Sequence, residues 1–482
     1  MGVIIEGRRS LPASWSKADL QWSFEPDYQS GLGIATNLEL SPPTVGEHAR
    51  QIVAFFDTPE VPVRLGGCIV DIIYQCVAGL DLHKETTVAA VRSIGPAGKV
   101  ETDLRTFGTM TRDLLELAEW LAAHGVTHVA MEATGVLWKP VWNILDGRFE
   151  LLLVNPRELK QVPGRKSDIK DAQWIAQLLQ HGLLRSSFVP GRSQRELRDL
   201  TRHRAQLEGE HTRAANRIHK LLEDANIKLG VVASDILGVS GREILDRLVE
   251  GEEDAASLAQ SARRRMRSKI PQLELALQGK FLPHHRFMLK QLLSHLDHLD
   301  QQIAQFTARI EELMVPFVDQ ELQEKLDAVP GVDLNTIQNV VAEIGVDMDQ
   351  FPSEAHLASW TGICPGNEES AGKRKRSKTT KGNRWLRRAL TQAAWAATHT
   401  KDSYLGAQYH RLAGRRGKKR ALVAVAHTLL VIIYHIIKYR VDYQDLGADY
   451  FLRLEPERQK RYLVKRLEQL GYEVQLAEKH AA

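Results

Sequence analysis

The chain has 482 residues, of which 43% are hydrophobic, and a formal net charge of +4. This length predicts two or three domains, and the hydrophobic content excludes a largely disordered chain. Its 3 cysteines include no Cys-x-x-Cys pair, which excludes a disulfide framework and a cysteine-based zinc site and favours a reducing cytoplasm.

Residues 1–69 differ from the rest of the chain. Proline, serine and glycine are scattered through them, and no hydrophobic period lasts long. So long a segment without regular structure is unusual inside a compact domain, so we expect a largely disordered extension. Order is expected to begin near Val70.

Residues 70–190 predict three strands, a helix, a strand, a helix, a strand and a helix. The segments before the last helix are 74–82, 85–92, 99–107, 111–124, 127–131, 135–145 and 149–154. The first three strands can form an antiparallel meander, and the later crossovers then add parallel strands. Gly125 is placed to end the first helix as a residue with positive φ.

Four acids stand where a mixed sheet would bring them together. Asp81 and Glu132 each end a predicted strand, and binding sites in open α/β sheets lie at the carboxyl ends of strands. Asp168 and Asp171 fall one turn apart in the last helix, which Ser167 is placed to cap. Each acid alone has an ordinary explanation, such as an acidic first helical turn. Together they favour a shared divalent cation, and hard oxygen ligands favour Mg²⁺.

The motifs around these acids resemble one known family. They are Val77-Ala78-Gly79-Leu80-Asp81-Leu82-His83-Lys84, Met131-Glu132-Ala133-Thr134-Gly135, Asn155-Pro156 and Lys166-Ser167-Asp168-Ile169-Lys170-Asp171. They resemble the DEDD-type transposases of bacterial insertion sequences, in the family numbered one hundred and ten, which is related to the pilin-gene invertase. The resemblance implies a ribonuclease-H-like (RuvC-like) fold, as in Holliday-junction resolvases. It also implies that Asp81, Glu132, Asp168 and Asp171 are the metal-binding tetrad.

Two long helices are predicted in residues 191–320. The first, from Arg195 to Lys228, places Leu200, Leu207, Ala214 and Leu221 at seven-residue spacing. The second has a continuous heptad seam, made of Leu289, Leu292, Leu296, Leu299, Ile303, Phe306, Ile310 and Leu313. We favour a coiled-coil arm that is available for dimerisation, and a hairpin within one chain is the alternative.

The carboxy-terminal half opens on a possible phosphate contact. Ala328-Val329-Pro330-Gly331-Val332-Asp333, followed by an apolar helical run to Ile344, resembles a helix-hairpin-helix. Such a hairpin can present backbone N–H groups to a phosphate.

Residues 357–373 include Pro365, Gly366 and Gly372, which predict a loop. The passage also resembles the second domain of the same family, in which the serine of a Ser-Gly-Lys-like element is the nucleophile. Ser370 is the matching residue, although Ala371 separates it from the glycine. Ser377 is the alternative.

Positive charge is concentrated after this serine. Nine lysines and arginines and no acid occur between Lys373 and Arg388, and two smaller clusters lie at Arg263–Arg265 and Arg415–Arg420. One such cluster is ordinary solvated surface, whereas three favour nucleic-acid binding. The predicted contact residues are Arg165, Lys166, Lys373, Arg374, Lys375, Arg376, Lys378, Lys381 and Arg384.

Two further helices are expected beyond this basic segment. One begins at Lys381-Gly382-Asn383-Arg384. The other is the most apolar run, from Ala421 to Lys438, which contains two histidines and is slightly short for a membrane span. We expect it to be a buried helix, and we expect no membrane partner.

The expected architecture is α/β plus α. It comprises the extension (1–69), a ribonuclease-H-like mixed-sheet domain (70–190), a coiled-coil or helical arm (191–320), a mostly helical transposase domain carrying the serine loop (321–445) and a helical tail (446–482). The resemblance covers roughly residues 70 to 440.

The resemblance implies a DNA transposase or recombinase acting through a covalent serine intermediate and a Mg²⁺-bound tetrad. Its implied partners are donor and target DNA, a non-coding bridge RNA, and further copies of the chain as a homodimer or a dimer of dimers. It implies a location at the bacterial nucleoid. The alternatives are a junction-resolvase-type nuclease that uses the tetrad alone, an inactive nucleic-acid-binding remnant, and a plain coiled-coil interaction protein.

Overall fold

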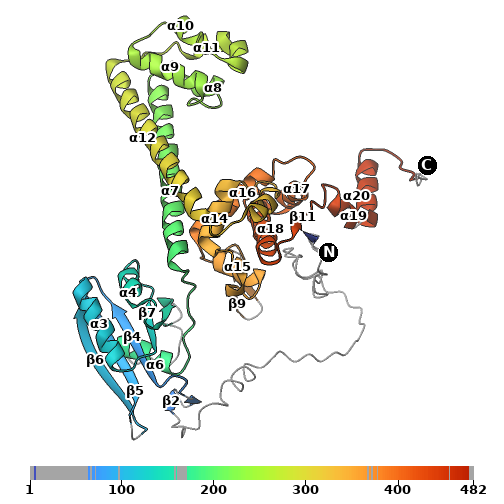
Figure 1. The fold of residues 1–482 in the computed structure, drawn as a ribbon. Helices are drawn as coiled ribbons and strands as arrows, with labels where there is room; N and C mark the ends of the chain where they lie inside the picture. Colours follow the sequence, from blue (N-terminus) through green and yellow to red (C-terminus); the bar gives the residue numbers. More distant parts are fainter. Residues whose placement is uncertain are drawn as a thin grey trace. The chain divides into compact units, whose positions relative to one another are not determined.

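The fold was analysed in a computed structural model. It describes residues 5–6, 63–65, 68–70, 72–95, 98–156, 159, 171–365, 368–370, 373–376, 378–454 and 456–476. The chain divides into two compact units (Figure 1). The sheet unit is Glu25–Val189, and the helical unit is Pro190–Ala482 together with Met1–Phe24. The predicted disordered extension falls mostly outside the described residues.

Three short strands are described before the main sheet. β2 (Val63–Leu65) and β3 (Cys68–Val70) pair with each other in antiparallel fashion. β1 (Ile5–Glu6) pairs in antiparallel fashion with β11 (Asp442–Tyr443) of the helical unit.

The sheet unit is built on five strands in the order β6-β5-β4-β7-β8 (Figure 1). They are β4 (Cys76–Leu82), β5 (Thr86–Ile94), β6 (Val100–Gly108), β7 (His128–Glu132) and β8 (Glu150–Val154). β4, β5 and β6 form an antiparallel meander, and β7 and β8 add parallel strands beside β4. The predicted mixed sheet is confirmed, and its strand order is ribonuclease-H-like.

Helices cover both faces of this sheet, as the side-chain alternation requires. Ala78, Leu80 and Leu82 of β4 share one core with α3 (Thr111–Ala123) and α4 (Trp138–Leu145). Val77 of β4 shares the opposite core with α6 (Asp171–Gln180).

Two glycines mark the ends of these helices. Gly125 has a φ of +70° directly after α3, as predicted. α4 begins at Trp138, three residues later than predicted. The reason is local, because Gly135 has a φ of +54° and Leu137 N–H donates to the Thr134 carbonyl, which makes a turn before the helix.

The arm of the helical unit is a hairpin of two long helices, α7 (Arg192–Asp224) and α12 (Pro283–Met314). They lie side by side in one chain and share one apolar core (Figure 1). Short helices at the arm's tip extend that core: α8 (Leu229–Val232), α9 (Val239–Glu250), α10 (Ala255–Ala259), η2 (Arg264–Lys269) and α11 (Ile270–Ala276).

The seam of α12 therefore packs against α7 of the same chain. The sequence favours a seam between two chains, with this hairpin within one chain as the alternative. Leu289, Leu296 and Leu299 of α12 are buried, as the heptads predict. On α7 the predicted positions Leu200 and Leu221 are only half-buried. The buried face of α7 instead comprises Gln194, Leu197, Thr201, Arg204, Leu207, Ala214, Ile218 and Leu222.

The rest of the helical unit packs around one apolar helix, α18 (Lys418–Tyr439). Its neighbours are α13 (Gln320–Asp327), η3 (Met348–Gln350), α15 (Glu354–Thr361), α16 (Arg384–Ala397) and α17 (Tyr404–Arg416). α14 (Leu334–Ile344) packs against α7, α13 and α16. Among the described helices, α18 has the length and composition to cross a membrane, but 72% of its most apolar window is buried inside the fold, as expected of a core helix. α19 (Tyr450–Leu454) and α20 (Pro456–Gln469) follow β11.

The predicted helix-hairpin-helix corresponds to α13, a turn and α14. Asp333 caps α14, because its Oδ1 accepts the N–H of Thr336 at 2.8 Å. Gly331 in the turn has a φ of +81°, and a Cβ placed there would lie 2.3 Å from the carbonyl oxygen of Ala393 in α16. The glycine side of this turn therefore faces α16 and packs against its backbone.

Candidate active site

Two of the predicted acids end neighbouring parallel strands. Leu80 pairs with Met131 in the β4–β7 register, so Asp81 and Glu132 follow at adjacent strand ends. Asp81 is on the same face of β4 as Gly79, and Glu132 is on the same face of β7 as Ala130, because side chains alternate along a strand. That face is the one covered by α6.

Gly79 brings the third acid to this face. A Cβ on Gly79 would lie 2.3 Å from the carbonyl oxygen of Ala172 and 2.4 Å from the amide nitrogen of Ala176. Only a residue without a side chain lets α6 approach β4 this closely. Asp171 is the first residue of α6, so the helix begins over the strand that carries Asp81.

Asp81 and Glu132 are partly exposed to solvent, and each has one polar side chain close to its carboxylate. The Asp81 side chain is 24% exposed, and its Oδ2 lies 3.2 Å from Nε2 of His83. Oε1 of Glu132 accepts the hydroxyl of Thr134 at 3.4 Å. Ser167 and Asp168 lie outside the described residues, as do Arg165 and Lys166.

Hard carboxylate oxygens gathered at one sheet edge suit a divalent cation of the Mg²⁺ type. In the described part of the chain, however, one group of ligand-type side chains has donor atoms all within 4.8 Å of one another, and it is Asp224, His284 and His285 in the arm. The described sheet acids Asp81, Glu132 and Asp171 do not form such a group. Their convergence on a shared metal together with Asp168 stays a prediction.

Within this group, His285 caps the first turn of α12. Nδ1 of His285 accepts the N–H of Leu282 at 3.1 Å, and its Nε2 lies 2.9 Å from Oδ2 of Asp224. Both ring nitrogens are therefore engaged, which leaves no lone pair for a cation.

Ser370 lies in a β-hairpin, so the prediction of a loop is wrong at this point. β9 (Glu368–Ser370) pairs in antiparallel fashion with β10 (Lys373–Arg376), and Ser370 is opposite Lys373. The register leaves two residues between them, the spacing of a tight hairpin. Acidic residue types in β9 also stand opposite basic types in β10, a pairing that favours antiparallel strands.

The base of this hairpin is fixed to two helices. Thr380 N–H donates to the Cys364 carbonyl at 3.2 Å, and Asn383 N–H donates to the Trp360 carbonyl at 3.1 Å. Gly382 is held against the end of α15, where a Cβ would lie 2.4 Å from the amide nitrogen of Gly362. The serine hairpin therefore leaves from a rigid junction of α15 and α16.

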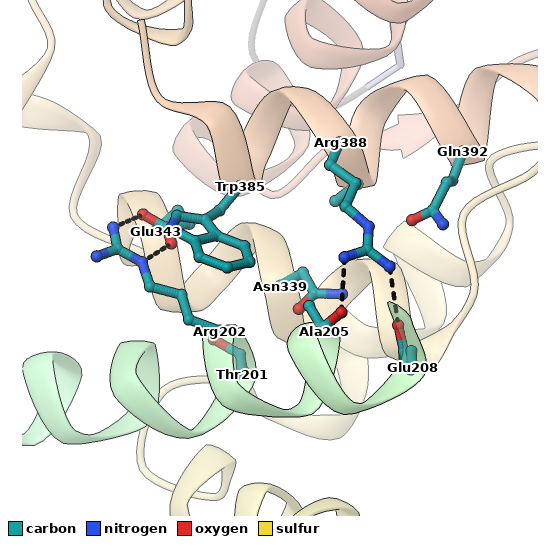
Figure 2. A pocket seen from close by; sticks show the side chains of 10 residues that line it. Thr201, Arg202, Ala205, Glu208, Asn339, Glu343, Trp385, Arg388 and Gln392 are labelled. Atoms are coloured by element: carbon teal, nitrogen blue, oxygen red, sulfur yellow. Dashed lines mark hydrogen bonds and ion pairs between the residues drawn. The ribbon is translucent and has the colours of Figure 1, made fainter. Parts of the chain in front are cut away.

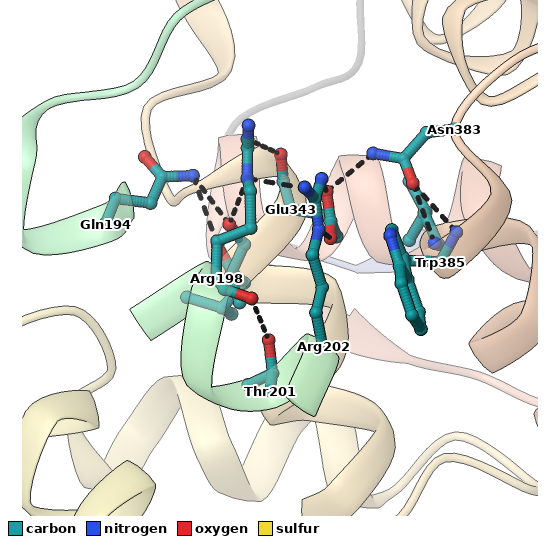
Figure 3. A network of polar contacts seen from close by, with 10 residues as sticks. Gln194, Arg198, Thr201, Arg202, Glu343, Asn383 and Trp385 are labelled. Carbon is teal, nitrogen blue, oxygen red and sulfur yellow. Dashed lines mark hydrogen bonds and ion pairs between the residues drawn. The ribbon is translucent and has the colours of Figure 1, made fainter. Parts of the chain in front are cut away.

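A buried carboxylate connects this junction to the arm (Figure 3). The Glu343 side chain is only 2% exposed. Nε and Nη2 of Arg202 donate to its two oxygens at 2.7 and 2.8 Å, and Nδ2 of Asn383 donates to its Oε2 at 2.5 Å. Oδ1 of Asn383 in turn accepts the N–H of Trp385 and so caps α16. One carboxylate thus joins α7, α14 and the helix that follows the serine hairpin.

Arg198 also belongs to this network, and its burial disfavours the charged form of its guanidinium. Its guanidinium donates to the Glu343 carbonyl at 2.6 Å and lies 3.4 Å from the Glu343 carboxylate. Burial lowers the pKa of Arg198 to about 10, although Glu343 beside it favours the charged form.

A small cleft of about 10 Å³ lies beside the network, between α7 and α16 (Figure 2). Nη1 of Arg388 donates to the Ala205 carbonyl at 2.6 Å, and its Nη2 lies 3.6 Å from Glu208. The Trp385 ring stands next to these contacts, with the Arg384 guanidinium 4.6 Å from its centroid. Lys378, Lys381 and Arg384 are exposed, whereas the other predicted contacts in this segment, Lys373, Arg374, Lys375 and Arg376, are described by their backbone alone.

The sequence prediction did not include Glu343 or Trp385. A signal for each is present, since Glu343 is an acid inside the apolar helical run Val340–Ile344 and Trp385 is an aromatic residue inside a basic run.

Comparisons with known proteins agree with these two regions. Residues 78–227, which contain all four predicted metal ligands, match the family model of IS110-type DEDD enzymes, described as "Transposase". Residues 323–410, which contain the serine hairpin, match "Transposase IS116/IS110/IS902 family". The chain is also 27% identical over 300 residues to the "Insertion element IS110 uncharacterized 43.6 kDa protein" of Streptomyces coelicolor, covering 57% of this chain and 72% of that protein. The chain belongs to the IS110 family of DEDD transposases.

Proposed function

We propose that this transposase cuts and rejoins DNA through a covalent bond to Ser370, with Asp81, Glu132, Asp168 and Asp171 holding Mg²⁺ at the reacting phosphate. The observation that carries the metal half of the proposal is the shared face of Asp81, Glu132 and the first residue of α6. The serine half is supported by the position of Ser370 at the end of β9, in a hairpin fixed at its base.

The chemistry is a balanced exchange of phosphodiester bonds. The Ser370 hydroxyl loses its proton and its oxygen attacks phosphorus, while the bond to one deoxyribose oxygen breaks and that oxygen takes a proton. A free deoxyribose hydroxyl of another strand later attacks the phosphoserine and releases the serine. The bond energy is retained, so no nucleotide triphosphate is required. Bound divalent ions would supply charge neutralisation at the attacking and leaving oxygens.

We further propose that a non-coding RNA of the element pairs with donor and target DNA, and that two or more copies of the chain act together. The basic segment around Lys378, Lys381 and Arg384 would contact the nucleic-acid backbones, since those contacts are largely electrostatic. Recombination of donor and target plasmids, with the adjacent non-coding RNA supplied or withheld, tests this part. Equal recombination without the RNA would contradict it.

Trapping on suicide DNA tests the serine. Wild-type protein is expected to give a protein–DNA adduct that survives denaturation, Ser370→Ala to lose it and Ser377→Ala to keep it. The reverse pattern would move the nucleophile to Ser377. Active protein without an adduct, or cleavage retained by Ser370→Ala, would favour a nuclease that uses the tetrad alone.

Substitution of the tetrad tests the metal site. Asp168→Asn and Asp81→Asn are expected to abolish strand transfer while RNA binding persists. Retained strand transfer would remove the metal proposal. Wild-type protein without any strand transfer would indicate an inactive remnant.

A further inference from the structure

We propose that a groove between α7 and α16 binds one unpaired nucleotide of a single DNA strand, with its base stacked on Trp385. The inference rests on the proposed function, in that DNA is taken as the substrate. The α7–α16 groove has a volume of about 360 Å³ and is lined by Ala205, Gly209 and Arg213 of α7 and by Arg384, Trp385 and Arg388 of α16, among others. This volume falls within the range of about 300–1,000 Å³ that is usual for small-ligand sites.

Trp385 provides the stacking surface of the groove. Trp385 is partly buried, and its backbone is fixed because its N–H donates to Oδ1 of Asn383 at 2.9 Å. The Arg384 guanidinium lies 4.6 Å from the ring centroid. A partly exposed aromatic ring beside arginines in an open groove is the composition of sites that stack the bases of single strands.

Gly209 lies on the α7 side of the groove, where it contributes no side chain. A glycine inside a helix destabilises it relative to alanine, so its position in the middle of α7 calls for a reason. Packing does not supply one, since a Cβ at this position would meet only Nη1 of Arg213, at an ordinary 3.5 Å. Ala205 lies one turn earlier on the same face. The two small residues leave room for a flat ring across from Trp385.

The charges of the groove suit a phosphate. Three arginines and one acid, Glu210, are among its lining residues. Arg388 is anchored by the Ala205 carbonyl and Glu208, as Figure 2 shows. Arg213 is 62% exposed and lies 3.6 Å from Glu210, and Arg384 is exposed. The net positive charge attracts a phosphate next to the stacked base.

The groove is also close to the proposed nucleophile along the chain. Trp385 is in the first turn of α16, whose cap Asn383 follows the serine hairpin along the chain. Ser370 is five residues from Pro365, which pairs with Thr379 at the hairpin base, so Ser370 lies at most about 18 Å from Pro365. Thr379 is in turn six residues before Trp385. The groove and the serine hairpin are therefore joined to the same end of α16 by short stretches of chain.

Binding of a short single strand tests the groove directly. The probe is a 12-nucleotide single-stranded DNA with one 2-aminopurine, whose fluorescence falls on stacking, mixed with the full chain in EDTA. Trp385→Ala is expected to weaken binding by about five- to one-hundred-fold, the usual effect of removing one stacking partner, and to abolish the quenching. Gly209→Leu is expected to do the same by filling the groove. Because leucine is a better helix former than glycine, its thermal stability should be equal to or higher than that of wild type.

The matched control is Trp395→Ala. Trp395 is on the same helix and is 53% exposed, but it does not line the groove, so this variant should bind and quench like wild type. Wild-type binding by both Trp385→Ala and Gly209→Leu would overturn the proposal, as would an equal loss in Trp395→Ala. Tighter, Trp385-dependent binding of an RNA of the same sequence would overturn the assignment to DNA. No cleavage occurs in EDTA, so failure here leaves the Ser370 chemistry standing, and loss of the adduct in Ser370→Ala leaves the groove standing.

Discussion

Glu343 is a carboxylate that the fold can bury only because other residues neutralise it and saturate its oxygens. Removing it leaves two partly buried arginines, Arg198 and Arg202, without their counter-charge, and breaking a buried ion pair typically costs about 3–5 kcal/mol. We therefore expect Glu343→Ala to lower the free energy of unfolding by about that amount in urea titrations. Glu343→Gln keeps an acceptor for Asn383 and should lose less.

The control for Glu343 is Glu312, an exposed partner of Arg309 whose side chain is 63% exposed. Surface pairs of this kind contribute about 0–1 kcal/mol, so Glu312→Ala should be nearly neutral. Equal losses at the two positions would show that the buried network contributes no more than a surface pair.

His435 in the core helix predicts a dependence of stability on acid. Burial, and then the charge of Lys438, lower the pKa of His435 to about 4, against about 6.5 in an unfolded chain. As the pH falls through this window, the unfolded state gains a proton that the folded state does not, so stability is lost. Between pH 7.5 and 4.5 this loss amounts to about 2–3 kcal/mol. His435→Gln should flatten the pH profile of the unfolding free energy by that amount, and an unchanged profile would contradict the assignment.

The position of a single residue could be predicted from the sequence where a local rule determines it. Asp81 and Glu132 could be placed at strand ends because alternation and strand length are local properties. Glu343 could not be connected to Arg202 in advance, because 141 residues separate the two along the chain. Only tertiary packing brings such partners together.

Among the elements, the contact of α6 with β4 depends most on one residue, Gly79. We expect Gly79→Ala to push α6 away from the strand, because the added Cβ would meet backbone atoms of Ala172 and Ala176 that cannot rotate aside. Overpacking of this kind costs about 1–3 kcal/mol. It should also displace Asp171 and reduce strand transfer, measured on plasmids alongside chemical unfolding.

A second glycine of the same unit provides the comparison. A Cβ on Gly95 would meet the end of the Glu101 side chain, which can move away. Gly95→Ala should therefore leave stability and strand transfer close to wild type. If Gly79→Ala behaves in the same way, α6 does not need the close approach to β4.

The arm makes a different prediction from the one that its heptads first favoured. Leu296 is 2% exposed and packs in the core shared by α7 and α12 of one chain. Leu296→Lys should therefore destabilise the arm, by at least the roughly 2–5 kcal/mol of a core leucine truncation, and leave the mass in light scattering unchanged. Val315→Lys, at a position 75% exposed, is the control for the added charge. A fall to monomer mass with full helicity in Leu296→Lys would place the seam between chains.

Elements with a strong period were predictable, and the serine hairpin was not. The strands of the sheet and the first long helix begin and end within a few residues of the predicted positions, and α12 contains the whole predicted seam. The segment around Ser370 is short and rich in glycine and charge, so its local propensity favours a loop. Its strands exist because Glu368–Ser370 and Lys373–Arg376 pair with each other, and pairing is not a property of either segment alone.

For the molecule as a whole, the sequence could not tell whether the long helices pair within one chain or between two chains. A heptad seam such as that of α12 specifies an apolar partner helix, but it does not say whether the partner belongs to the same chain. The structure supplies α7 as the partner, through buried positions such as Ile218 and Leu222, which do not belong to the predicted series Leu200, Leu207, Ala214 and Leu221.

The described cores of the two units share no residue, which predicts that the units unfold separately. The cores around Leu80 and Val77 contain only residues of the sheet unit, whereas the arm core contains only residues of the helical unit. Residues that share no core are not obliged to unfold together, so calorimetry of the full chain should show two transitions. Gly79→Ala should lower only the transition of the sheet unit, by about 3–10 °C at the cost given above, and Glu343→Ala should lower only that of the helical unit. A single transition that both substitutions shift equally would mean that contacts between the units are strong enough to couple them.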